Sequence, residues 1–308
     1  MSLAAASRIG LVHCPVTALA FGQQWRAKAR HEFQVMAVAN PNVKSKSSSD
    51  KGQNGAGKGK SEAANVAMET VAKKAPVTAE RNVSHWDLPI ENPHVPRALQ
   101  AVDAQNPEGT VGREHNDYTV LQQHCAFFDR NGDGIIYPQE TYEGFRALGY
   151  SPTISVLAAI VINGSFSYPT YDGWIPDPRF PIYLSKVHRT KHGSDTEVYD
   201  TEGRFLPSKF EEIFNKYAKT RPDAMTYEEI LRMTDGMRNV NDPYGWSAAK
   251  LEWGFTYWLV KDEEGFASKE KIRGVYDGSF FDQVEREIKQ GKDKGKKVEL
   301  QKIDAHNN

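Results

Sequence analysis

A stretch of twelve residues from Asp129 to Glu140 constrains this chain more than any other feature. Its sequence, Asp-Arg-Asn-Gly-Asp-Gly-Ile-Ile-Tyr-Pro-Gln-Glu, fits the calcium-loop pattern D-x-[DN]-x-[DN]-G-x5-E without a gap. A calcium ion takes six to eight hard oxygen ligands, and this spacing supplies them from one tight turn. Gly134 stands where the chain turns sharply, a position that penalises a β-carbon. The pattern predicts a calcium site, and the alternative is a solvated Asp/Asn/Gly turn.

The predicted ligands are three side chains, one backbone carbonyl and one bidentate carboxylate: Asp129, Asn131, Asp133, Ile135 and Glu140. Apolar residues at helical spacing flank the loop, which predicts the helix–loop–helix of an EF-hand over about 117–150. Because such loops usually pack in pairs, a partner is expected. The best candidate, 262–270, lacks the first and last carboxylates and is therefore either a degenerate second hand or a simple turn.

Composition excludes some classes of protein. The formal net charge of the 308-residue chain is −1, which argues against a nucleic-acid partner. No acidic residue precedes Glu32, and the Ala- and Ser-rich composition there predicts a disordered N-terminal extension over 1–78. This extension is either an organelle transit peptide or a tail without targeting value. Residues 291–308 form a Lys-rich tail.

Residues 151–184 are predicted to associate with a membrane. No charged residue stands between Arg146 and Asp172, but prolines and polar residues interrupt the run. An amphipathic helix at the interface fits better than a span, with one face formed by Ile154, Leu157, Ala158, Val161 and Ile162. The alternative is a buried helix of a soluble core. The three prolines that follow force a stiff reversal: Pro176, Pro178 and Pro181.

Three histidines carry the candidate chemistry. His124 lies on the apolar helix before the calcium loop, where a buried structural histidine is the default reading and an axial heme ligand is the second. His188 and His192 are spaced i, i+4, as two ligands on one helical face would be, but zinc would need a third ligand. The basic residues beside them suit either a phospholipid headgroup or plain solvent exposure. The part from 185 to 290 is predicted to be helical.

Several blocks of sequence resemble the caleosins, calcium-binding lipid-droplet proteins that are also called plant peroxygenases. The similar blocks are Leu121-Gln-Gln-His-Cys-Ala-Phe-Phe-Asp129, Gly134-Ile-Ile-Tyr-Pro138, Phe180-Pro-Ile-Tyr183, Lys191-His-Gly-Ser-Asp195 and Tyr199-Asp-Thr-Glu-Gly-Arg-Phe205. The resemblance implies a mainly α caleosin domain over 79–290, with one EF-hand and a membrane-associating segment. It also implies a proline knot, which here is the reversal that contains Pro176, Pro178 and Pro181.

The resemblance also implies a heme b held by two histidines, which match His124 and His192, with His188 as the alternative to the second. The implied reaction transfers an oxygen atom from a fatty-acid hydroperoxide to an unsaturated fatty acid or similar acceptor. The implied location is the surface of a lipid droplet or of the endoplasmic reticulum, with a plastid as the alternative and a homo-oligomer allowed. The competing interpretation is a noncatalytic, calcium-dependent structural or adaptor protein of lipid droplets.

Three charged residues depart from the family pattern at the proline knot: Asp172, Asp177 and Arg179. A charge at the centre of a bilayer is costly, so these residues predict shallow rather than deep insertion. Calcium is further expected to set the angle of the helices that flank its loop. Because His124 lies on one of them, we expect loss of calcium to displace this histidine.

Overall fold

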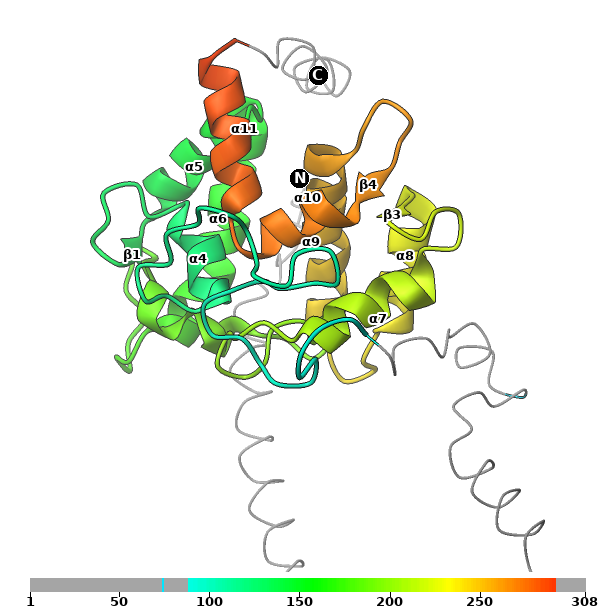
Figure 1. Ribbon diagram of the computed structural model, residues 1–308. Coiled ribbons are helices and arrows are strands. Elements are labelled where there is room, and N and C mark those ends of the chain that lie inside the picture. Colours follow the sequence, from blue (N-terminus) through cyan, green and yellow to red (C-terminus); the bar gives the residue numbers. More distant parts are fainter. Residues whose placement is uncertain (1–73, 75–87, 292–308) are drawn as a thin grey trace, which may run out of the picture. The chain divides into compact units, whose positions relative to one another are not determined.

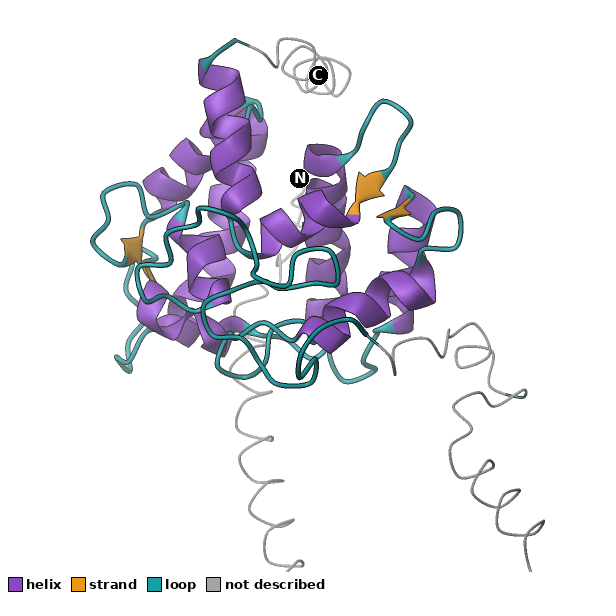
Figure 2. Ribbon diagram, viewed as in Figure 1, coloured by secondary structure: helices purple, strands orange, loops and turns teal. Residues whose placement is uncertain are grey.

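The computed structural model describes residues 74 and 88–291, which lie in one compact unit of the chain, Asn65–Asn308. The predicted N-terminal extension and Lys-rich tail therefore fall outside the described residues, apart from residues 74 and 291. The described part is mainly helical and contains two short antiparallel strand pairs (Figures 1 and 2). This confirms the predicted fold class at the level of mainly α.

The predicted helix–loop–helix around residues 129–140, which we call the acidic loop, is present. Helix α4 (Val120–Ala126) leads into the loop, strand β1 (Ile135–Ile136) follows, and helix α5 (Pro138–Ala147) leaves it. Helix α4 begins with a capping box in which Thr119 and Gln122 satisfy each other's backbone N–H groups. Pro138 occupies the first turn of α5, where no N–H is needed.

The partner of the acidic loop is not the segment that the sequence indicated. Strand β1 pairs with strand β2 (Ile182–Tyr183), so that Ile135 lies opposite Tyr183, directly after the three prolines. Segment 262–270 instead contributes strand β4 (Ala267–Ser268), which pairs with strand β3 (Ala224–Met225). Of the two alternatives for 262–270, a degenerate partner of the acidic loop is therefore wrong, whereas a turn that leads into a helix agrees with the structure.

Strands β3 and β4 join two further helix–loop–helix units to each other. One unit is α7 (Pro207–Tyr217), β3 and α8 (Tyr227–Gly236), and the other is α9 (Pro243–Val260), β4 and α10 (Lys269–Tyr276). In the first unit the Glu229 carboxylate accepts the backbone N–H groups of Lys219 and Thr220, each at 2.8 Å. Backbone hydrogen bonds to the Glu229 carboxylate thus hold this loop in its conformation.

The remaining elements close the core. The 3₁₀ helix η2 (Leu184–Thr190) follows β2, and helix α11 (Ser279–Lys289) packs against α10 (Figure 1). Glu285 of α11 pairs with Arg130 of the acidic loop at 2.8 Å. An aromatic cluster made by Phe127, Phe128, Phe145 and Phe281 joins α4, α5 and α11. Each buried Phe contributes about 1.5–3 kcal/mol. The cluster therefore fixes α4, and with it His124, against α11.

Helix α6 (Pro152–Thr170) buries polar side chains and exposes large apolar ones, which is the reverse of the usual arrangement in a helix that faces water. Its buried residues include Ser155, Asn163, Ser167 and Thr170. Its exposed large residues are apolar, namely Val156, Leu157, Ile160, Val161 and Tyr168. The predicted single apolar face is therefore only partly correct, because Ala158 is buried while Leu157 and Val161 face outward. Within 88–291, no helix has the length and apolar character needed to cross a membrane.

Candidate functional site

The acidic loop has the backbone of a cation-binding turn. Gly132 and Gly134 have φ values of 73° and 81°, which favour glycine. The Asp129 carboxylate accepts the N–H groups of both glycines, at 2.9 and 2.8 Å. Asn131 and Asp133 each accept an N–H two residues further on, at 2.9 and 2.8 Å. The loop is thus shaped by its own side chains before any ion binds.

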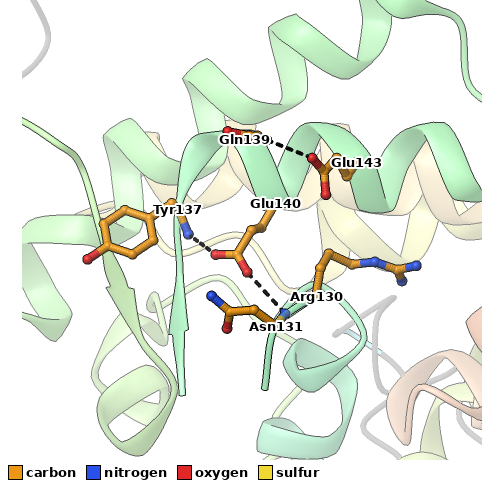
Figure 3. A pocket seen from close by; sticks show the side chains of 6 residues that line it. All are labelled: Arg130, Asn131, Tyr137, Gln139, Glu140 and Glu143. Carbon is orange, nitrogen blue, oxygen red and sulfur yellow. Dashed lines mark hydrogen bonds between the residues drawn. The ribbon is translucent and has the colours of Figure 1, made fainter. Parts of the chain in front are cut away.

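Glu140, the predicted closing ligand, is turned towards the backbone. Its Oε2 accepts the N–H of Tyr137 at 2.9 Å, and its Oε1 accepts the N–H of Asn131 at 3.4 Å (Figure 3). The side chain forms one wall of an open pocket of about 400 Å³. In this arrangement no three His, Cys, Asp or Glu side chains of residues 88–291 gather closely enough to hold a metal. The oxygen donors of this loop are of the kind that calcium takes.

The acidic loop is tied to the elements that carry the histidines. The N–H of Leu184, the first residue of η2, donates to the Gly134 carbonyl at 2.9 Å. Gln122 on α4 donates from Nε2 to the carbonyl of the same Leu184 at 3.2 Å. The loop therefore connects α4, which bears His124, with the segment that leads to His188 and His192.

The ring of His124 is held by a backbone carbonyl of another helix. Its Nδ1 lies 2.7 Å from the carbonyl oxygen of Val275 on α10. Because a carbonyl only accepts, Nδ1 carries the proton and Nε2 keeps its lone pair. Burial lowers the pKa of His124, against the opposing effects of the Val275 carbonyl, Glu252 and Asp277, so the ring is neutral at pH 7. A neutral imidazole oriented by a backbone carbonyl fits an axial heme ligand.

His192 fits iron ligation less well. Its Nδ1 accepts the N–H of Ser194 at 3.2 Å, and its Nε2 lies 3.8 Å from a Glu252 carboxylate oxygen. Desolvation opposes protonation, but Glu252, Asp195 and Asp242 together raise the pKa of His192. Both ring nitrogens therefore face other groups. Ligation by this histidine stays a prediction.

His188 lies on η2 and is partly buried. Helix η2 ends at Thr190, and Lys191 has a non-helical ψ of 126°. The expectation that His188 and His192 share one helical face is therefore wrong. Within 88–291 these two histidines also join no group of three metal-binding side chains, so a zinc site has no support.

Asn163 on α6 joins the acidic loop to the proline knot. The residue is 1% exposed. Its Nδ2 donates to the carbonyls of Ile136 on β1 and Phe180 in the knot, at 3.1 and 3.0 Å. Its Oδ1 accepts the Thr141 hydroxyl at 2.7 Å. Phe180 has a φ of 52°, a strained value for a bulky residue, and Asn163 holds its carbonyl in place.

The charged residues of the knot are neutralised in pairs. Asp177 accepts hydrogen bonds from Arg179, with the Nη2–Oδ2 distance at 2.8 Å. Asp172 pairs with Lys186 and, at 2.9 Å, with Arg189. The side-chain hydrogen bonds from these cations lower the pKa of both carboxyl groups. Lys186 and Arg189 therefore already have an anionic partner, which weakens the proposed headgroup contact.

Pro176, Pro178 and Pro181 lie in the reversal between α6 and β2, as the sequence predicted. The reversal presents Trp174 and Ile175 to solvent, with exposed fractions of 92% and 77%. We call the exposed large apolar residues of α6 and of this reversal, taken together, the α6–knot face. Its exposed large residues are Val156, Leu157, Ile160, Val161, Tyr168, Trp174, Ile175 and Phe180.

Comparison with known proteins agrees with this set of features. Residues 116–285 match the family described as "Caleosin related protein". The chain is 53% identical to a peroxygenase of Lilium longiflorum over 219 residues, covering 71% of this chain and 92% of that protein. It is 46% identical to the probable peroxygenase 4 of Arabidopsis thaliana over 167 residues, covering 54% and 86% respectively. The chain belongs to the caleosin family, in its peroxygenase class of oxidoreductases.

A third relative introduces a contrast. A probable inactive peroxygenase-like protein of Arabidopsis thaliana is 39% identical over 176 residues, which cover 57% of this chain and 84% of that protein. No solved structure matches the chain.

Sequence reasoning did not find two acidic residues next to His192. Asp242 and Glu252 contact it from the N-cap and the middle of α9, far along the chain. The one local signal was the Asp-Pro pair at 242–243, which is typical of a helix start.

Proposed function

We propose that this chain is a calcium-binding heme peroxygenase that works at a lipid surface. It would transfer one oxygen atom from a fatty-acid hydroperoxide to an unsaturated fatty acid or a similar acceptor. The observation that carries the proposal is the hydrogen bond from His124 Nδ1 to the Val275 carbonyl. This bond fixes the orientation of a neutral imidazole ring and leaves the lone pair on Nε2. The match to named peroxygenases supports the reaction class.

His124 would ligate the iron of the heme. When bound, the heme supplies the metal centre at which the O–O bond of a hydroperoxide is cleaved. The protein's own contribution is to fix the imidazole through the Val275 carbonyl and to pack its ring edge against Phe281, at a centroid distance of 5.1 Å. The hydrogen bond restricts rotation of the ring within its plane, and the contact with Phe281 restricts its tilt.

Calcium would bind in the acidic loop through Asp129, Asn131, Asp133, the Ile135 carbonyl and Glu140. Leu184 donates its N–H to the Gly134 carbonyl of the loop and accepts a hydrogen bond from Gln122, and these two bonds support a regulatory role. Filling the loop would stiffen the connection between α4 and η2. Chelation would accordingly loosen His124, which an absorbance spectrum of the heme-loaded chain with and without chelator would detect.

The α6–knot face would rest on the phospholipid monolayer of a lipid droplet or on the endoplasmic reticulum membrane. Its apolar side chains and the paired charges of the knot suit shallow contact. A plastid location through the N-terminal extension is the alternative, and self-association stays a prediction. The second candidate function, a noncatalytic lipid-droplet coat, has in its favour the inactive-like relative.

An isotope experiment tests the reaction. Full-length protein reconstituted with hemin is given oleic acid and an ¹⁸O-labelled fatty-acid hydroperoxide. We expect ¹⁸O in the epoxide of oleic acid and an alcohol from the hydroperoxide in equal amount. Unlabelled epoxide, or no epoxide from a chain that takes up no heme, would contradict the proposal and favour the coat protein.

A further inference from the structure

Loop 218–229, between α7 and α8, is closed by the same contacts as the acidic loop. In the acidic loop the twelfth residue, Glu140, accepts the N–H groups of the third and ninth residues, at 3.4 and 2.9 Å. In loop 218–229 the twelfth residue, Glu229, accepts the N–H groups of the third, Thr220, and the ninth, Thr226, at 2.8 and 2.9 Å. Strands β1 and β3 both occupy positions seven and eight. Loop 218–229 therefore has the frame of an EF-hand loop.

Loop 260–271, between α9 and α10, has the same frame and is the partner of that loop. Met225 and Ala267, each at the eighth position of its loop, lie opposite each other where β3 pairs with β4. Gly265 at the sixth position has a φ of 83°, close to the 81° at the same position of the acidic loop. The carboxylate of Asp262, at the third position, accepts the N–H groups of the fifth and seventh residues at 3.0 and 2.8 Å.

The two ends of loop 260–271 differ from those of a calcium loop. The first position holds Val260, which is 0% exposed, and the twelfth holds Lys271. Lys271 Nζ donates a hydrogen bond to the Val260 carbonyl at 2.9 Å. A calcium ion joins the first and twelfth positions of its loop through their carboxylates. Here the ammonium group of the twelfth residue joins the same two positions directly.

The position of this ammonium group suits a cation that replaces an ion. Val260 is the last residue of α9, so its carbonyl lies at the helix end that attracts positive charge. Lys271 itself stands in the first turn of α10, where a positive charge is unfavourable for the helix dipole. The contact with α9 therefore accounts for a lysine at this position, whereas the needs of α10 do not.

We propose that loops 218–229 and 260–271 form an EF-hand pair that keeps its conformation without calcium. Glu229 closes the first loop through backbone hydrogen bonds, and the ammonium group of Lys271 acts in the second as a built-in cation. A lysine cannot dissociate from its loop. The joint between α9 and α10 is accordingly insensitive to chelators, and the response of this chain to calcium is confined to the acidic loop.

This arrangement has a consequence for His124. The carbonyl that orients its ring at 2.7 Å belongs to Val275, which lies on α10 one turn after Lys271. The ring is thus held from α10 by a frame that does not depend on calcium, whereas its own helix, α4, leads into the acidic loop.

Removal of the built-in cation tests the first part of the proposal. Lys271→Met removes the ammonium group but keeps most of the aliphatic side chain. We expect the Tm of the full-length chain to fall by about 3–8 °C, because the Val260 carbonyl loses a charged donor. Added calcium should not restore the Tm, since the variant gains no carboxylate. The control Lys289→Met breaks a pair of a lysine that is 70% exposed and should lower Tm by less than about 2 °C.

The reverse experiment converts the loop into a calcium site. Val260→Asp combined with Lys271→Glu places carboxylates at the first and twelfth positions, beside Asp262, Glu264 and the carbonyl of Phe266 at positions three, five and seven. Isothermal titration calorimetry of the full-length double variant should show one more calcium ion per chain than the wild type. Lys271→Met should show no additional ion.

Two results would overturn the inference. One is a Lys271→Met variant with the Tm of the wild type, and the other is a double variant that binds no additional calcium, whether or not it folds. A wild-type chain that binds no calcium at all would instead contradict the proposed site in the acidic loop. The gain of one ion by the double variant would still support the built-in cation.

Discussion

The Glu140 carboxylate accepts the N–H of Tyr137 at 2.9 Å, so the residue that should close a calcium site caps its own helix instead. We expect Glu140→Gln to weaken calcium binding by more than about tenfold, a loss of at least about 1.4 kcal/mol, because bidentate ligation by a charged group is lost. Isothermal titration calorimetry measures the change.

The fold should survive Glu140→Gln because glutamine also completes a capping box. The matched control is Glu143→Gln, which lines the same pocket but pairs with Gln139 at 2.8 Å. Equal calcium affinity in both variants would contradict the assignment of Glu140 as a ligand.

The buried hydrogen bonds of Asn163 on α6 predict a large effect of this residue on stability. Asn163→Leu keeps the size of the side chain but leaves the Ile136 and Phe180 carbonyls without their donor. We expect the free energy of unfolding to fall by about 3 kcal/mol, because buried acceptors lose their partners. Urea denaturation measures the loss. Ile160→Ser, at an exposed position of the same helix, should change stability by less than about 0.5 kcal/mol.

The α6–knot face predicts lipid binding that depends on outward apolar residues. Ile160 is 66% exposed, and Ile160→Ser should reduce the fraction of protein that floats with phospholipid-coated triacylglycerol droplets. The matched control is Val111→Ser, because Val111 is equally apolar and 96% exposed but lies before α4. A similar loss of flotation in both variants would argue against a specific face.

Glu229 predicts a pH-dependent contribution to stability. Desolvation acts to raise its pKa, but the hydrogen bonds from Thr226, Thr220 and Lys219 lower it overall. A carboxyl group with a lowered pKa in the folded protein stabilises the fold above its ordinary pKa of about 4.5 and loses this contribution as pH falls through the folded value. Glu229→Gln should therefore lower stability at pH 7 and match the wild type in strong acid.

Denaturant titrations at pH 7 and at successively lower pH values measure this difference. Glu228→Gln, an exposed neighbour in the first turn of α8, is the control. A stability gap that stays constant down to strong acid would show that the ionised carboxylate is not the cause.

Some of this structure follows from the sequence by local rules. The acidic loop and the position of His124 on the helix before it are set by spacing within a few residues. The proline reversal follows from fixed φ angles and missing N–H groups. These features depend on neighbours in the chain, and the structure has all of them.

Other features depend on contacts between distant segments. Strand β1 has two residues, too few for a period of two to indicate its partner β2. The inward face of α6 could not be predicted from the sequence, because polar residues usually face water, whereas Asn163 and Ser167 are buried here. The hydrogen bond that the Gly193 N–H donates to Asp242 joins residues 49 positions apart, and no local sequence pattern indicates it.

The central claim is that His124 presents its Nε2 to a heme iron. The most direct measurement is the absorbance spectrum of the full-length chain reconstituted with hemin, beside His124→Ala and His94→Ala, a histidine in the exposed segment before α4. The account predicts a Soret band in the wild type and in His94→Ala that is lost or shifted in His124→Ala. A band that His124→Ala leaves unchanged, or a wild-type chain that stays colourless, would contradict the claim.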